Sequence, residues 1–162
     1  MASKGQMTGM LGVYLVAAEL SRRDFIVSVT SRSAAGADLL ITDQKCKKAW
    51  SVQVKTNRKP ANFWLLNPNV AMIGHDSDDE YDSHMYVFVN IRSPKQPDEF
   101  IVVPSRHVHK HICKEVAKTG AIWYSFLRSD RITESSGWEL FGEGSISSSA
   151  STNPQTAPSP AP

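Results

Sequence analysis

Residues 36–57, GADLLITDQKCKKAWSVQVKTN, decide the fold that we expect for this chain. The stretch contains two short apolar runs, residues 38–42 and residues 49–55, and runs of this composition are typical of strands. The charged residues 43–48 between them form a connection short enough for a hairpin. The sequence therefore predicts two antiparallel strands that lie side by side.

The second of these strands carries different chemistry on its two faces. Because side chains alternate along a strand, Trp50 and Val54 lie on an apolar face, which we expect to pack on a helix. Gln53 and Lys55 lie on the other face, and Asp38 opens the neighbouring strand close to them. The pattern therefore predicts a carboxylate, an amide oxygen and an ammonium group within a few ångström of one another.

This combination of groups suits hydrolysis of a phosphodiester. Mg²⁺ takes oxygen ligands and keeps several waters, and it helps to form hydroxide from a bound water. A nearby Lys55 could orient that water and offset negative charge in the transition state. Taken singly, Asp38 could be a turn residue after Gly36 and Lys55 a solvated strand end, so only the joint pattern favours a site.

A predicted helix over residues 10–23 precedes the strands, after a start, residues 1–9, that we expect to be flexible. The helix has apolar positions at helical spacing and no proline. Glu19 lies among its apolar side chains, and burial of an unpaired carboxylate is costly. We therefore expect Glu19 to lie near solvent, near a metal or in an ion pair with Arg22 or Arg23.

Further strands and one further helix are predicted downstream. The strands are expected at residues 25–30, 63–66, 85–91 and 100–103. The helix is expected over residues 106–118, with Ser105 as its N-cap and Gly120 as its end. Two short aromatic segments, residues 122–126 and 138–141, are expected to close the core.

Composition favours one domain, residues 1–142, followed by a disordered tail rich in Ser, Pro and Ala, residues 143–162. Residues 1–59 hold ten Lys and Arg against four Asp and Glu, whereas residues 60–162 hold eight against twelve. The basic half suits a nucleic-acid partner, because Lys and Arg displace the counterions condensed on a phosphate backbone. A solvated basic face would give the same bias.

Cysteine usage and hydropathy predict a cytoplasmic protein. Cys46 and Cys113 match no zinc spacing and no disulfide framework, so we expect reduced thiols. The apolar residues 10–20 are too few for a membrane span, which takes ~20 residues. Arg22 and Arg23 follow this stretch, the reverse of the charge order in a signal peptide.

Glu19, Gly36-Ala37-Asp38 and Gln53-Val54-Lys55 together resemble the PD-(D/E)XK, or restriction endonuclease-like, nuclease superfamily. Its Holliday junction resolvase-like members and a homing endonuclease with the Gln variant are the members most resembled. The resemblance covers roughly residues 8–120. It implies an α/β fold with an αβββαβ core, in which helices flank a mixed central sheet.

The resemblance also implies a Mg²⁺-dependent DNA endonuclease, for which Mn²⁺ could substitute and which could form a homodimer or larger homo-oligomer. Asp38 would be the central metal ligand, and Gln53 would give its amide oxygen where a Glu usually stands. The backbone carbonyl of Val54 would be a further ligand, and Lys55 would position the attacking water. Glu19 would complete the site directly or through water.

Other interpretations stay open at this point. A nucleic-acid-binding module without activity, or a protein-interaction module, could use the same fold. His107 and His111, like His109 and Cys113, stand four residues apart and could bind a metal, but with no third ligand in view we favour a basic solvated helix. The acidic residues 76–82 lack the features of an EF-hand, and we interpret them as a solvated loop.

Overall fold

The computed structural model describes residues 3–31, 36–67 and 83–142, and the structural statements below concern these residues. The first half contains α1 (Lys4–Ser21), β1 (Ile26–Val29), β2 (Leu39–Thr42), β3 (Ala49–Asn57) and β4 (Phe63–Leu66). The second half contains β5 (His84–Asn90), β6 (Glu99–Pro104), α3 (Ser105–Lys110), β7 (Cys113–Val116), β8 (Ile122–Leu127) and two 3₁₀ turns, η1 (Arg128–Asp130) and η2 (Trp138–Phe141). The expected acidic loop and C-terminal tail lie largely outside these ranges.

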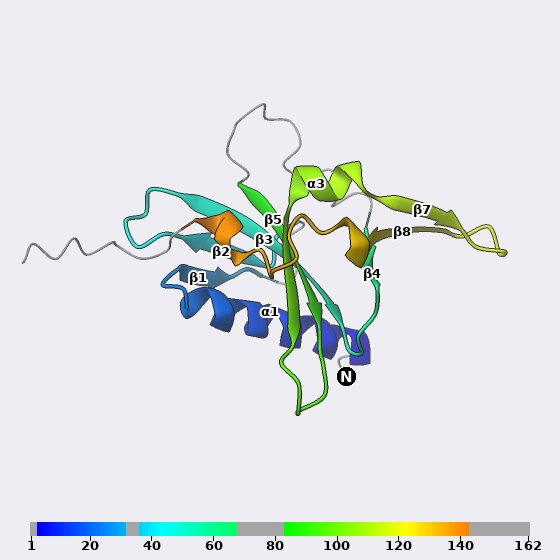
Figure 1. The fold of residues 1–162 in the computed structure, drawn as a ribbon, viewed down its shortest axis with the longest axis horizontal. Helices are drawn as coiled ribbons and strands as arrows, with labels where there is room; N and C mark the ends of the chain where they lie inside the picture. Colours follow the sequence, from blue (N-terminus) through cyan, green and yellow to red (C-terminus); the bar gives the residue numbers. More distant parts are fainter. Residues whose placement is uncertain (1–2, 32–35, 68–82, 143–162) are drawn as a thin grey trace, which may run out of the picture.

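A five-stranded mixed sheet with the order β1-β2-β3-β5-β6 forms the centre of the structure (Figure 1). β2 and β3 are antiparallel, with Leu39 opposite Val52, as the sequence predicted. β3 and β5 are parallel, with Gln53 opposite Tyr86, and every other pair in this sheet is antiparallel. The predicted mixed α/β class is thus confirmed. The αβββαβ order also predicts a second helix before β5. Its place in the chain, residues 68–82, lies outside the described residues.

A second sheet, with the order β4-β8-β7, corrects one prediction. The expected helix over residues 106–118 ends as α3 at Lys110, and β7 follows it. Gly120 does not end a helix but lies, at φ 82°, in the turn of the β7–β8 hairpin. This hairpin projects from the body of the molecule (Figure 1). Pairing with β8 outweighs the helical preference of residues 113–116, a tertiary effect that local propensity does not contain.

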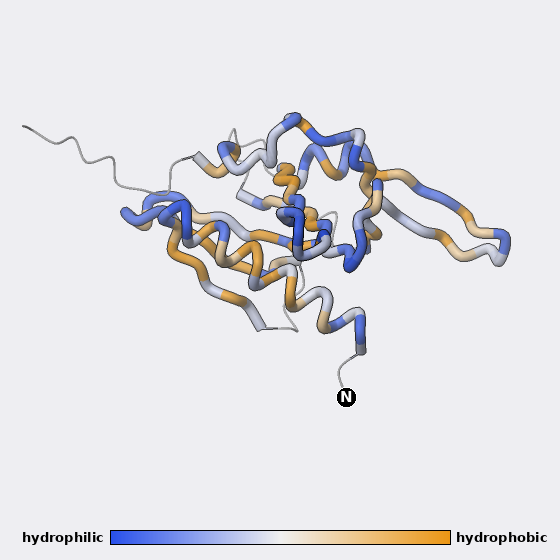
Figure 2. Tube along the Cα trace, turned by 60° about the horizontal axis from the view of Figure 1, so that its bottom comes forward, coloured by the Kyte–Doolittle hydropathy of each residue, from blue (hydrophilic) through white to orange (hydrophobic). Residues whose placement is uncertain are grey.

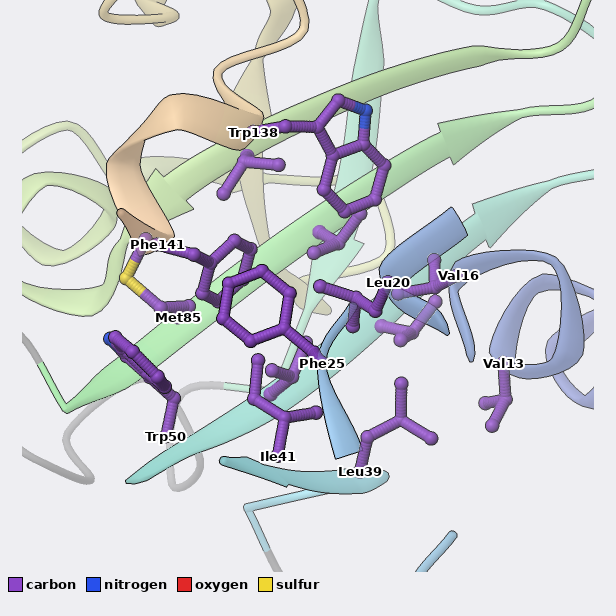
Figure 3. Packing of buried hydrophobic residues seen from close by; sticks show 14 of the residues in the cluster. Val13, Val16, Leu20, Phe25, Leu39, Ile41, Trp50, Met85, Trp138 and Phe141 are labelled. Atoms are coloured by element: carbon purple, nitrogen blue, oxygen red, sulfur yellow. The ribbon is translucent and has the colours of Figure 1, made fainter. Parts of the chain in front are cut away.

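Each face of the central sheet has its own core. Helix α1 covers one face, where its residues Val16 and Leu20 meet strand residues such as Val52. Figure 3 shows Phe25, Trp50 and Phe141 packed on this side, and their ring centroids are 5.6–6.0 Å apart in edge-to-face pairs. The second sheet and α3 cover part of the other face through a cluster that contains Trp64, Tyr86, Phe88, Val108 and Phe126. Figure 2 shows hydrophobic positions along the strands and in α1, and hydrophilic positions in the connecting loops.

Helix α1 begins at Lys4, so the prediction of a flexible start is wrong for residues 4–9. Ser3 and Gln6 form a capping box: the Gln6 backbone N–H donates to Ser3 Oγ (3.2 Å), and the Ser3 N–H donates to Gln6 Oε1 (2.8 Å). Reciprocal bonds of this kind satisfy two backbone donors at the helix start. No helix among the described residues is long and apolar enough to cross a membrane.

Gly12 allows α1 to approach β3 closely. A Cβ at this position would lie 1.8 Å from Oγ1 and 2.8 Å from Cβ of Thr56. Both Gly12 and the Thr56 hydroxyl are buried in this contact, and Oγ1 has no hydrogen-bond partner among the described residues. The distance between α1 and the sheet therefore depends on the missing side chain at position 12.

Gly12→Ala should lower the free energy of unfolding by about 1–3 kcal/mol, because the new methyl group overpacks against Thr56. Gly9→Ala is the matched control, since nothing lies within 4 Å of the place that a methyl group would take there. That variant should gain up to ~1 kcal/mol from helix propensity. Urea unfolding of both variants checks the prediction, and equal stabilisation by the two would contradict it.

Candidate active site

The backbone around Asp38 is fixed by two neighbouring strands. The Asp38 N–H donates to the Val52 carbonyl (2.8 Å), and the Asp38 carbonyl accepts from the Thr30 N–H (3.0 Å). The Thr30 hydroxyl donates to the Ala37 carbonyl (2.7 Å). These hydrogen bonds fix the main chain at Ala37 and Asp38, independently of the contacts that the Asp38 side chain makes.

The Asp38 carboxylate lies above β3 and accepts two hydrogen bonds at the same oxygen. Its Oδ2 accepts from the Val54 backbone N–H (2.8 Å) and from Nε2 of Gln53. Gln53 is buried, with 8% of its surface exposed. The predicted meeting of Asp38 with Gln53 is therefore present, with the amide nitrogen, rather than the oxygen, directed at the carboxylate.

Lys55 follows Gln53 on the same face of β3 and is close enough to Asp38 for electrostatic attraction. Burial lowers the pKa of the Lys55 ammonium, because a charged group loses hydration there, and the negative charge of Asp38 partly opposes this change. The net direction is downward. Lys55 therefore releases its proton more readily than a solvent-exposed lysine.

Two residues of β5 that the sequence analysis missed line the same region. Tyr86 lies opposite Gln53 in the parallel register, and burial together with the charge of Asp38 raises its pKa to about 12. His84 lies opposite Ser51, and its Nε2 is 2.7 Å from the Gly36 carbonyl oxygen. The alternation of residues 84–90 could have placed both on one face, but only the fold shows that β5 is the neighbour of β3.

The structure does not bring Glu19 to this group. Its carboxylate is paired with Arg22 (2.5 Å) and Arg23 (2.7 Å) of its own helix, the ion-pair alternative that the sequence left open. Helix α1 packs on the sheet face opposite to Gln53 and Lys55. Metal ligation by Glu19 stays a prediction without a contact to support it.

Other proposed ligands can also be placed. Val54 contributes its N–H to the carboxylate, and ligation by its carbonyl stays a prediction. His107 of α3 and His111, the C-cap of α3, stack at a centroid distance of 4.1 Å, and His107 Nε2 lies 2.7 Å from the Asp130 carbonyl oxygen. Cys113 lies in β7, so it does not share a helix face with His109. Within the described ranges, no three His, Cys, Asp or Glu side chains lie close enough to hold one metal.

The donor set at Asp38 fits one weakly held divalent ion. Asp38 offers one carboxylate, and rotation of the Gln53 amide would turn Oε1 toward the place that Nε2 now faces. Mg²⁺ retains several waters, so two protein oxygens can suffice for binding. The ion would compete with the hydrogen bonds that Asp38 already accepts.

Comparison with known proteins gives a likeness of fold to solved structures. No protein-family model matches the sequence, and no curated protein matches it. A similar solved structure is Hjc, a Holliday junction resolvase from the archaeal hyperthermophile Archaeoglobus fulgidus. The two chains are 10% identical with a TM-score of 0.48, over 76% of this chain and 91% of that chain. A likeness at this level of identity concerns the fold alone.

Glu19→Gln tests whether Glu19 acts as an ion-pair partner. The hydrogen bond from Arg23 is the main cause that lowers the Glu19 pKa below 4.5, and Arg22 adds to it. Because the folded pKa is depressed, the stabilisation is present above pH 4.5 and is lost as the pH falls through the lowered value. The variant should lose about 1 kcal/mol or less at pH 7, since Arg22 is largely exposed and water screens the ion pairs at this helix end.

Thermal unfolding from pH 7 to pH 3 measures this difference, which should shrink at the acidic end. Glu115→Gln on the exposed strand β7 is a control that should show no such trend. A Glu19→Gln protein of unchanged stability but weakened divalent-metal binding would instead support the ligand role.

Proposed function

We propose that this chain is an endonuclease that hydrolyses phosphodiester bonds in DNA and depends on Mg²⁺ or Mn²⁺. The observation that carries the proposal is the contact between Asp38 and Gln53, with Lys55 next along the same face of β3. A carboxylate, an amide oxygen and a partly buried ammonium are the groups that this hydrolysis needs. The resemblance of their sequence motif to PD-(D/E)XK nucleases supports the same activity.

A bound divalent ion supplies polarisation of the phosphate and a more acidic water. Asp38 and Gln53 would hold the ion, and the fixed backbone at Asp38 would keep the carboxylate in place. Lys55 would hold the attacking water and offset the negative charge that develops on the phosphate. The lowered pKa of Lys55 suits a group that exchanges a proton with that water.

An open sheet face and a basic hollow elsewhere on the chain support a polyanionic partner. Leu40, on the same sheet face as Gln53, is 52% exposed, so this face is open beside the site. Away from the site, Arg58 follows the end of β3 and lines, with Lys4 at the start of α1, a hollow of about 650 Å³. Cations of this kind favour a phosphate backbone. Assembly as a homodimer and a cytoplasmic location, which would suit the free thiols of Cys46 and Cys113, belong to the same proposal.

Asp38→Asn should lower Mg²⁺-dependent cleavage of plasmid DNA by at least ~100-fold, because a charged metal ligand is removed. Asn keeps an oxygen that can accept from the Val54 N–H, so the fold should persist. Asp43→Asn in the exposed β2–β3 loop is the matched control and should cleave normally. Equal cleavage by wild type and Asp38→Asn would refute the proposal.

Gln53→Glu should strengthen metal binding, because it adds a second carboxylate beside Asp38. We expect the Mn²⁺ concentration for half-saturation to fall about tenfold, which corresponds to ~1.4 kcal/mol. Without metal, two adjacent carboxylates repel, so the variant should melt earlier at pH 7 than wild type and recover when Mn²⁺ is added. Calorimetric titration and thermal unfolding with and without Mn²⁺ measure both effects.

A second candidate function is a nucleic-acid-binding module without cleavage. The observation that favours it is the Asp38 carboxylate, which is already satisfied by two neutral N–H donors. DNA binding that weakens with salt but is unchanged in Asp38→Asn, together with no cleavage in Mg²⁺ or Mn²⁺, would establish this alternative.

A further inference from the structure

His84 occupies a buried position next to the candidate site. It begins β5, and only 4% of its surface is exposed. Its Nε2 lies 2.7 Å from the carbonyl oxygen of Gly36. Since a carbonyl can only accept a hydrogen bond, Nε2 carries the proton and donates it. Nδ1 has no partner among the described residues, so this single bond is the one polar contact that the structure gives the ring.

The acceptor of this bond lies two residues before Asp38. Gly36 is buried and has a φ of 89°, a conformation that L side chains rarely adopt. Thr30 and Val52 hold the backbone of Ala37 and Asp38, on the C-terminal side of this turn. His84 holds the carbonyl group of Gly36 itself. Without His84, a buried carbonyl would lose its partner, which favours rotation of the glycine backbone.

The imidazole ring is itself held in place by β5. Tyr86 packs against it edge to face at a centroid distance of 5.5 Å, and Phe88 stacks on Tyr86 at 5.7 Å. Tyr86 lies opposite Gln53 in the register of β3 and β5. One strand therefore fixes the histidine that holds the Asp38 turn and also borders the amide that contacts the Asp38 carboxylate.

We propose that His84 is a positioning residue, which sets the direction of the Asp38 carboxylate by holding the Gly36 carbonyl across the sheet. The inference rests on the proposed function only for its consequence, which is metal binding. His84 takes no part in the reaction itself. Residues that orient a metal ligand in this way typically change metal affinity 10–100-fold when they are replaced, roughly the effect expected here.

Two measurements on His84→Leu test the proposal. The first is the amide resonance of Val54 in metal-free protein, because this N–H donates to Asp38 Oδ2 and reports where the carboxylate lies. The second is Mn²⁺ binding by calorimetry. We expect the Val54 resonance to shift and the dissociation constant for Mn²⁺ to rise about tenfold or more.

Three further variants control the experiment. His84→Gln keeps an N–H donor at a similar reach. It should largely retain the wild-type Val54 resonance and the wild-type Mn²⁺ affinity. His111→Leu makes the same substitution at an exposed histidine of the α3 end and should change neither. If His84→Leu does not unfold cooperatively, His84→Asn replaces it, because the shorter amide does not extend to Gly36.

The outcomes separate this inference from the proposed function. An unmoved Val54 resonance and wild-type Mn²⁺ affinity in folded His84→Leu would overturn the positioning role and leave the nuclease proposal intact. If His84→Gln shows the same shifted Val54 resonance and the same weakened Mn²⁺ binding as His84→Leu, His84 has a packing role. That result would also overturn the inference. If wild type binds no Mn²⁺, the nuclease proposal fails, and the Val54 resonance alone decides the role of His84.

Discussion

The structure depends on the position of β3 at the centre of the mixed sheet. This strand pairs antiparallel with β2 and parallel with β5, so both of its edges are used by hydrogen bonds. Its apolar face packs on α1, and at Gly12 the contact is so close that a Cβ would overlap the Thr56 side chain. The other face therefore carries the polar side chains Gln53 and Lys55, and β2 delivers Asp38 to them.

This arrangement gives the carboxylate of Asp38 neutral hydrogen-bond donors and one nearby cation. Its partners are an amide and a backbone N–H, and the nearby cation, Lys55, is partly buried. A carboxylate that is held without a full counter-charge can attract a divalent ion, yet it is stable without one. On the proposed function, competition between Gln53 and a metal ion for this oxygen would decide between a nuclease and a binding module without activity.

The two carboxylates Glu19 and Asp38 lie on opposite faces of the central sheet. Glu19 lies on the α1 side, where Arg22 and Arg23 neutralise it, and Arg23 also stacks over Trp138 at 4.6 Å. A second acid therefore does not approach Asp38 from this helix. On the opposite side, Tyr86 and His84 close the region with aromatic rings that carry no charge at neutral pH, since burial raises the Tyr86 pKa and lowers the His84 pKa.

The sequence by itself determined the β2–β3 hairpin, the two faces of β3 and the meeting of Asp38 with Gln53, because alternation and a short loop are local constraints. It also contained the Ser3–Gln6 capping box, a local signal that the predicted start of α1 overlooked. Only the tertiary structure decided that β5 lies parallel beside β3, which brings His84 and Tyr86 to the site, and that residues 113–116 pair with β8. The pairing of β3 with β5 depends on contacts between distant segments, whose free energies no local pattern records. Glu19 and residues 113–116 have local partners, on α1 and in a hairpin, and there the fold selects one of two alternatives that the local sequence allows.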